Sequence, residues 1–304
     1  MEFVHCPVLA DEVINGLDVK KDGSYLDCTV GGAGHSYLIA SKLENGSLIC
    51  VDKDDDALNV SKKRLEKFDF VRFIKSDYKN LESELLFESF DGILIDMGVS
   101  SYQIDNGERG FSFNHDGPLD MRMDKKQKLD AKVVVNTFSK ENLEKIIFEF
   151  GEEKFAKSIA ANIVKQRQLK PVDTTFQLKE IIDHAVPAKY RFQGAYKKTF
   201  QALRIFVNNE LEGLDKTLRF LVSKLNVGGR LAVITFHSLE DRIVKNTFKE
   251  LATDCICPPK TPICVCNHRA QIKLISRKPI IASEQEIAQN PRSRTAKLRV
   301  VQKI

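Results

Sequence analysis

The stretch that decides the fold is LDCTVGGAGHS, residues 26–36, in which an acid and two β-branched residues precede three glycines. The apolar run at 24–30 predicts a buried strand, and residues 36–43 have the spacing of a short amphipathic helix. A strand-to-helix turn leaves backbone N–H groups free at the helix N-terminus, and Gly31, Gly32 and Gly34 let a ligand approach the main chain closely. The stretch therefore predicts a nucleotide-binding turn.

Strands and helices continue to alternate after this turn. Residues 46–52, 71–77 and 91–99 predict strands, and residues 55–68 predict a helix between the first two. This alternation predicts an α/β fold with a doubly wound, mostly parallel sheet that binds ligands at the carboxyl ends of its strands. Four acids lie at or near such ends: Asp27, Asp52, Asp77 and Asp96.

The alternation stops after the fourth strand. Residues 102–125 are rich in Gly, Asp and Asn and predict a loop, and residues 139–186 have helical spacing without strands. A helix predicted over 199–225 leads back to the sheet. The remaining predicted elements bring the sheet to seven strands: strands at 228–236, 271–279 and 296–303, and a helix at 237–251. We therefore predict one sheet domain, residues 1–105 and 200–304, with an inserted helical domain, residues 106–199.

Composition and charge limit the classes of protein. The 304 residues, 42% of them hydrophobic, can bury a sizeable core in one large domain or two smaller ones. No stretch approaches the roughly 18 uninterrupted apolar residues of a membrane span, and the first residues lack the apolar core of a signal peptide. We expect a cytoplasmic protein without a membrane partner.

The net charge of +5 is unevenly distributed along the chain. Residues 258–304 carry +8, which leaves −3 for residues 1–257, and residues 184–209 form a second basic segment without any acid. Clustered cations favour a polyanionic partner such as nucleic acid. A solvated basic face is the alternative interpretation.

Two cofactors suit a glycine-rich turn followed by an acid at the end of the next strand: NAD and S-adenosylmethionine. Asp52 can accept the ribose hydroxyls of either one. The dinucleotide pattern G-x-G-x-x-G, begun at Gly32, meets Tyr37 instead of its third glycine, which disfavours NAD. S-adenosylmethionine carries an ammonium that suits Asp27, a carboxylate that suits the backbone of the turn, and an adenine that suits the region of Tyr78.

Seven blocks of the chain carry a resemblance to a known family. They span nearly the whole sequence: residues 5–13, 27–36, 95–105, 108–124, 199–211, 228–245 and 290–299. The blocks ERGFSFNHDGPLDMRMD and GGRLAVITFHSLEDRIVK are long and chemically unusual, which makes chance agreement implausible. In this order the blocks resemble those of the bacterial ribosomal RNA small-subunit methyltransferase H family.

The resemblance implies a class I S-adenosylmethionine-dependent methyltransferase with a Rossmann-like sheet, whose inserted helical domain recognises the substrate. It further implies N4-methylation of one cytidine in the decoding region of 16S rRNA, in the small ribosomal subunit. By position it implies a cofactor site: Ala33, Gly34, His35, Asp52, Tyr78, Asp96 and Gln103. Tyr78 and Tyr102 stand where relatives commonly have Phe and Pro, and relatives also vary at Ala33.

Methylation of a cytosine amine requires alignment of the amine, the methyl carbon and the sulfur, together with an acceptor for the amine N–H groups. The Pro-Pro-aromatic element of the DNA amino-methyltransferases is absent after Asp96. We interpret Asp96 as the acceptor that faces the amine, and the next candidates are Asp120, Arg122 and His237. The alternative for His237 is a helix N-terminal residue, with Ser238 as the cap and Asp241 three residues on.

Two segments are candidates for contact with rRNA: residues 290–299 and residues 189–204. Phe192, Tyr196 and Phe200 interleave with the cations of the second segment and could stack on bases. The alternative is that these aromatic residues belong to the core of the insertion.

The seven cysteines of a cytosolic chain argue against a disulfide framework. Four of them form the pattern C-x-C-x6-C-x-C, with His268 nearby: Cys255, Cys257, Cys264 and Cys266. Four thiolates could bind zinc, although C-x2-C pairs are more typical of zinc sites. A metal there would brace the fold, so we assign no metal to the reaction.

Two other classes of function stay open at this point. An NAD-linked oxidoreductase is disfavoured by Tyr37 and by the lack of an evident hydride-transfer site. A catalytically silent ribosome-assembly factor is disfavoured by the intact acids and glycines of the predicted site: Asp27, Gly32, Gly34, Asp52 and Asp96. The sequence leaves monomer and homodimer open.

Overall fold

Five parallel strands and an antiparallel edge form one sheet in the computed structural model, which describes residues 7–258 and 263–304. Strand order is β3-β2-β1-β4-β5-β8-β6, and β7 also pairs with β8. The chain builds outward from β1 to β3 and then crosses back to β4, so the topological switch point lies between β1 and β4. The bounds are β1 (Ser24–Asp27), β2 (Ser47–Asp52), β3 (Val71–Lys75), β4 (Phe90–Asp96), β5 (Leu225–Thr235), β6 (Ile272–Leu274), β7 (Ile280–Ile281) and β8 (Lys297–Lys303).

The predicted α/β fold with a mostly parallel sheet is confirmed. One predicted strand, residues 271–279, is shorter than expected, because β6 ends at Leu274 and β7 begins only at Ile280. Pro279 precedes β7 and has no N–H to donate to a strand ladder. The described part of the sheet therefore has eight strands. Two of them, β6 and β7, are short and pair with different parts of β8.

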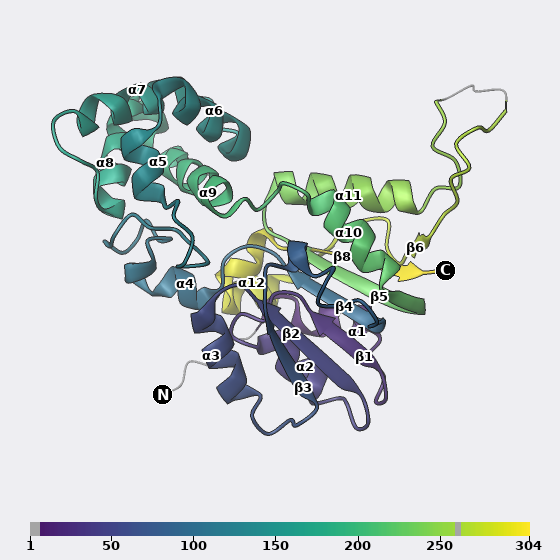
Figure 1. The fold of residues 1–304 in the computed structure, drawn as a ribbon. Coiled ribbons are helices and arrows are strands. Elements are labelled where there is room, and N and C mark those ends of the chain that lie inside the picture. Colours follow the sequence, from purple (N-terminus) through teal and green to yellow (C-terminus); the bar gives the residue numbers. More distant parts are fainter. Residues whose placement is uncertain (1–6, 259–262) are drawn as a thin grey trace. The chain divides into compact units, whose positions relative to one another are not determined.

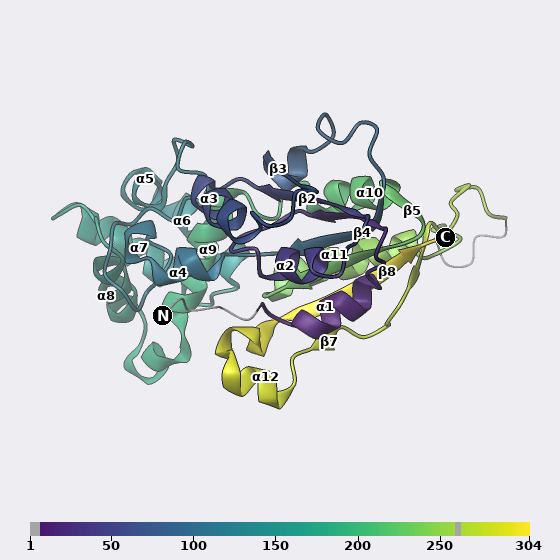
Figure 2. The same ribbon diagram turned by 90° about the horizontal axis from the view of Figure 1, so that it is seen from below.

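Side chains of the central strands alternate between two cores. Leu26 and Ile93 pack on the face that carries α10 and α11, whereas Tyr25 and Leu94 pack on the face that carries α1, α2 and α3. The sheet therefore lies between two layers of helices (Figures 1 and 2). The helices are α1 (Ala10–Leu17), α2 (Gly34–Ala40), α3 (Asp55–Arg64), α10 (Leu214–Ser223), α11 (Ser238–Leu251) and α12 (Glu284–Gln289), with the 3-10 helices η1 (Tyr78–Asn80) and η4 (Pro291–Thr295).

Residues 99–212 form a second unit with a hydrophobic core of its own, separate from the sheet unit, residues 1–98 and 213–304. The boundaries differ from the predicted 106 and 199, because α4 begins the helical unit and α9 closes its core. No described helix is both long and apolar enough to span a bilayer. The helices are α4 (Ser101–Asp105), α5 (Ala131–Thr137), α6 (Lys140–Gly151), α7 (Ala156–Arg167), α8 (Thr175–Ala185) and α9 (Ala195–Asn208), with η2 (Gly107–Arg109) and η3 (Ala188–Gln193).

The prediction of a single helix over 199–225 was wrong. α9 ends at Asn208, because Asn209 adopts the left-handed conformation with a φ of 49°. Gly213, with a φ of 73°, then precedes α10. Between them Glu210 turns back and binds Arg204 through two hydrogen bonds of 2.9 Å. This buried pair, which lies outside any local pattern, accompanies the break.

Buried polar side chains hold the irregular loop before α5. The Arg109 guanidinium donates to the carbonyl oxygens of Arg122 and Met123, at 2.9 and 3.1 Å. From α9, the Asn208 side chain accepts from the Met123 N–H at 2.7 Å and donates to the Met121 carbonyl at 2.8 Å. The loop and α9, far apart in sequence, therefore form one structural unit.

We expect Asn208→Ala to lower the free energy of unfolding of the helical unit. It leaves the Met123 N–H and the Met121 carbonyl buried without partners, at a cost of about 1–3 kcal/mol each. Thermal unfolding followed by circular dichroism measures the change. Asn142→Ala, at an exposed position on α6, is the matched control and should change the melting temperature little. Equal melting temperatures for the two variants would contradict this account.

Candidate functional site

Three carboxyl groups lie at the ends of adjacent parallel strands. Asp27 ends β1 and is in register with Cys50 of β2 and Leu94 of β4. Asp52 lies two residues after Cys50, and Asp96 lies two residues after Leu94. Both therefore lie just beyond Asp27 at the carboxyl edge of the sheet. This edge flanks the switch point between β1 and β4, where open α/β sheets bind their ligands.

Asp27 holds the glycine-rich turn from inside. Its side chain is only 1% exposed, and its two carboxylate oxygens accept from the Thr29 N–H at 3.0 Å and the Ser36 hydroxyl at 2.5 Å. The Thr29 hydroxyl in turn accepts from the Asp96 N–H at 2.7 Å. Strand β1, the turn and the start of α2 are thereby joined to β4. Sequence reasoning missed Thr29 and Ser36; the D-x-T spacing, typical of an Asx turn, was the available signal.

The three glycines of the turn serve different purposes. Gly31 has a φ of 49°, and its N–H donates to Asp52 at 2.9 Å. A Cβ on Gly34 would lie 3.0 Å from the Pro7 side chain, so this glycine permits packing. A Cβ on Gly32 would meet no atom within 4 Å. The space beside the Gly32 Cα is therefore open, so a ligand can approach the backbone there.

Burial disfavours the charged form of each strand-end carboxyl group. It raises the pKa of Asp27 and of Asp52 to about 6. The pKa of Asp96 rises to about 8, first because of burial and then because of the nearby charges of Asp27 and Glu240. Asp96 Oδ1 is buried and has no hydrogen-bond partner among the described residues. Asp96 is thus the acid of this edge whose hydrogen-bonding capacity the fold leaves unsatisfied.

His35 does not neutralise Asp96. Burial lowers the pKa of His35 to about 4, so its ring is neutral near pH 7. Its Nε2 lies 2.9 Å from the Val8 carbonyl oxygen, which can only accept, so we assign the proton to Nε2. Nδ1, the lone-pair nitrogen, then faces Asp96 Oδ2 at 3.6 Å. This arrangement adds no positive charge to the edge and favours a protonated Asp96.

Two predicted site residues, Gln103 and Asp120, belong to the helical unit. Gln103 closes the capping box of α4, with its side-chain oxygen accepting from the Ser100 N–H at 3.0 Å. Asp120 is bound by Arg122 through two side-chain hydrogen bonds of 2.8 and 2.7 Å. Burial raises the pKa of Asp120, but the hydrogen bonds from Arg122 outweigh it and hold that pKa below its usual value. Asp120 therefore has little capacity to act as a base.

His237 is the N-cap of α11, one residue earlier than the alternative interpretation placed the cap. Its Nδ1 accepts from the Glu240 N–H at 3.4 Å, and Glu240 accepts from the backbone N–H groups of Phe236 and His237. Asp241 instead binds Arg299 of β8 at 2.8 Å. His237 is thus committed to the cap through the nitrogen lone pair that a general base would need.

The aromatic residues of the second basic segment are mostly core residues. Phe200 is buried in the helical core, and Tyr196 packs against Phe113 with ring centroids 5.1 Å apart. The side chain of Phe192 lies outside the described part of the chain. The stacking hypothesis is therefore wrong for Phe200. Lys189, Lys197 and Lys198 are exposed, so the helical unit retains a cationic surface.

The other candidate segment, residues 290–299, follows the sheet edge. Lys297 of β8 is in register with Thr235, the last residue of β5, so η4 lies at the edge where Asp96 ends β4. Lys297 and Arg299 both bind Asp241, whereas Arg294 of η4 is exposed. Arg294 is thus placed better than the two β8 cations to contact an anion.

The chain matches a known protein family. The MraW methylase family model matches residues 2–304. The chain belongs to the MraW methylase family. It is 52% identical to the ribosomal RNA small subunit methyltransferase H of Finegoldia magna over 311 positions, and 50% identical to that of Clostridioides difficile, with all of each chain covered.

The cofactor of this methylase is S-adenosylmethionine, so the prediction that preferred it to NAD is confirmed. The residues present fit such a group. The open backbone at Gly32 permits close approach, and the buried, unpartnered oxygen of Asp96 suits a cation or an N–H donor. Anionic Asp27 and Asp52 add a negative potential that favours a positively charged ligand.

We expect Gly32→Val to weaken cofactor binding without unfolding the protein. The side chain enters open space, but it covers the backbone that the cofactor approaches. Titration calorimetry with S-adenosylhomocysteine should show a loss of affinity of about tenfold or more, with a smaller loss for Gly32→Ala. Both variants should keep the wild-type melting temperature. Unchanged affinity in Gly32→Val would place the cofactor elsewhere.

Asp96→Asn should stabilise the ligand-free protein increasingly as the pH rises. A carboxyl group whose folded pKa is raised to about 8 stabilises the fold below its unfolded pKa near 4 and loses that contribution as the pH rises through 8. Asparagine does not ionise and escapes this loss. The melting-temperature difference between variant and wild type should therefore widen between pH 5 and 8.5, by about 2–4 °C per kcal/mol. A constant difference would show that Asp96 ionises normally.

Proposed function

We propose that this methylase transfers a methyl group to the N4 amino group of one cytidine in the decoding region of 16S rRNA. The full-length relatives are named for methylation of small-subunit ribosomal RNA, and the sequence blocks of the chain resemble theirs throughout. The observation that carries the choice of an amine as acceptor is the buried, unpartnered Oδ1 of Asp96. A carboxylate oxygen without a partner is suited to accept an N–H from a substrate amine.

The cytosine amino group is a poor nucleophile, because its lone pair is delocalised into the ring. An acceptor for its N–H groups favours the pyramidal nitrogen that attack requires. S-adenosylmethionine supplies a methyl group on a sulfonium sulfur, and the C–S bond breaks as the new C–N bond forms. Asp96 Oδ1 accepts the amine N–H and then takes the proton that the nitrogen loses. Because the pKa of Asp96 is about 8 without a ligand, we propose that the positive charge of the bound cofactor first favours its ionised form, which is a stronger base than an ordinary aspartate.

The other residues of this edge bind and position. Asp52 ends β2 and Tyr78 follows β3, and we assign them to the ribose and adenine of the cofactor, together with the backbone of Gly32. Thr29 and His35 act through Asp96, by holding its backbone and by facing its Oδ2. Asp27 positions the turn and contributes negative charge. Ala33 and Gly34 complete the proposed cofactor site on the sheet unit, and Gln103 is assigned to the cofactor by the sequence resemblance alone.

Cationic residues of both units would bind the phosphates of the RNA. Arg294 is exposed at the sheet edge, and the exposed lysines of residues 189–198 provide charge on the helical unit. Phosphate contacts of this kind supply affinity and make it salt-dependent. We assign substrate recognition to the helical unit, residues 99–212.

The test is methyl transfer from radiolabelled S-adenosylmethionine to small ribosomal subunits that lack the modification, with the product nucleoside identified by mass spectrometry. We expect N4-methylated cytidine at one decoding-region position. Asp96→Asn should lose about 100-fold or more of the rate, within the range for a general base. His237→Asn preserves the helix cap and should retain most of the rate.

Two results would contradict this proposal. Transfer to a ring carbon, or to a different base, would show that Asp96 does not face a cytosine amine. An absence of transfer to subunits and to naked rRNA, with cofactor binding intact, would favour a non-catalytic assembly role.

A further inference from the structure

The segment between α11 and β6, residues 252–271, is here called the cysteine arm. Its described parts extend away from the sheet unit (Figure 1). At its base the Gln271 N–H donates to the Leu251 carbonyl at 2.8 Å, and the His268 ring contacts the Glu250 carbonyl at 3.0 Å. Beyond this base the described residues of the arm form no helix or strand.

Hydrophobic burial does not hold the outer part of the arm. Its large apolar side chains face solvent: Ile256 is 48% exposed, Ile263 77% and Val265 76%. A segment of this length that keeps its aliphatic residues outside needs another source of stability, because ordering each residue costs about 1–2 kcal/mol of backbone entropy.

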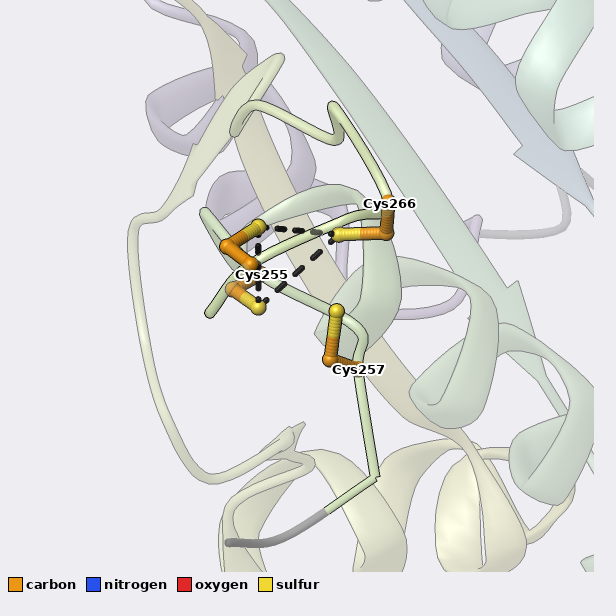
Figure 3. Close-up of side chains that lie close together, drawn as sticks. Cys255, Cys257 and Cys266 are labelled. Carbon is orange, nitrogen blue, oxygen red and sulfur yellow. Dashed lines mark hydrogen bonds between the residues drawn. The ribbon is translucent and has the colours of Figure 1, made fainter. Parts of the chain in front are cut away.

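Four cysteine sulfurs of the arm lie close together: Cys255, Cys257, Cys264 and Cys266. Each C-x-C pair has one residue between its two cysteines. The exposed Ile256 and Val265 are those intervening residues. The sulfurs of the two pairs lie together, and residues 259–262, between the pairs, are outside the described part of the chain. Figure 3 shows the side chains of Cys255, Cys257 and Cys266 converging.

The sulfur positions match a tetrahedral metal site. The Sγ atoms of Cys255, Cys264 and Cys266 are 3.5, 3.5 and 3.8 Å apart, and all four sulfurs lie within 4.8 Å of one another. Four thiolates at a Zn–S distance of about 2.3 Å define a tetrahedron with edges of about 3.8 Å. The separations are too long for S–S bonds of about 2.05 Å. They are too short for an iron–sulfur cubane, which binds each thiolate to a different iron.

The polypeptide also prepares one of these sulfurs to be a ligand. The backbone N–H groups of His268 and Ile256 donate to the Cys266 sulfur. Amide-to-sulfur hydrogen bonds stabilise a thiolate and orient it, as outer contacts do around metal ligands in general.

We propose that Cys255, Cys257, Cys264 and Cys266 bind one structural zinc ion that holds the cysteine arm together. All four coordination positions are filled by protein sulfur, which is the arrangement of a closed, non-catalytic zinc site. The arm has no hydrophobic core, so the bonds between zinc and the four sulfurs stabilise its folded conformation. The site lies in a segment that none of the residues assigned to methyl transfer occupies.

Metal analysis of the full-length protein, purified under reducing conditions without an affinity tag that binds metals, tests this proposal. We expect one zinc per chain, and a cobalt-substituted sample should show the intense visible absorption of a tetrahedral four-thiolate site. Cys264→Ser/Cys266→Ser should lose the zinc and become cleavable by protease within residues 252–271. Ile256→Ser, which changes an exposed residue between two ligands, is the matched control and should keep the metal.

Four outcomes would overturn the proposal. They are retention of stoichiometric zinc by the double variant, iron in place of zinc, disulfides among the four cysteines under reducing conditions, and failure of the metal-free protein to take up zinc at one equivalent. Because cofactor binding is measured separately, a failure of the methyl-transfer proposal would leave this result unaffected.

Discussion

Three acids share one water-poor edge of the sheet, and the structure around them follows from the need to satisfy their oxygens. Asp27 and Asp52 obtain N–H and O–H donors from the glycine turn and the residues that follow the strands. This need accounts for the left-handed Gly31 and for Thr29 two residues after the strand. Asp96 receives no such donor on Oδ1, and the charge of Asp27 raises its pKa further.

A carboxyl group with one buried, unsatisfied oxygen is costly to a ligand-free protein and useful to a methyltransferase. A cation at this edge lowers the cost of ionising Asp96, and a substrate N–H satisfies its free oxygen. In the reaction proposed above, the same group would link the binding of a positively charged cofactor to the recognition of an amine. Stability is given up at this edge for function, as is common where polar groups are arranged for a reaction.

Charge pairing elsewhere decides which cations stay available to RNA. Arg204 and Arg299 carry the same charge as the other cations of the two basic segments. Each of them, however, is bound to a carboxylate of its own unit. Arg294, Lys189 and Lys197 are exposed and form no ion pair with a carboxylate of the described residues. The cysteine arm shows a different solution to a shortage of stabilising contacts, because four sulfurs converge where aliphatic side chains face outward.

The sequence by itself determined the strands of the sheet, the glycine turn and the acids at the strand ends, because hydrophobic periodicity and backbone geometry are local properties. It did not determine the break after Asn208, the cap at His237 or the burial of Phe200. Each of these depends on a partner distant in sequence or on a competition between neighbouring residues: a charge pair, a buried carboxylate, or a core formed by other helices. Only the tertiary structure showed that one acid, Asp96, keeps an oxygen free, since that depends on every group that the fold brings around it.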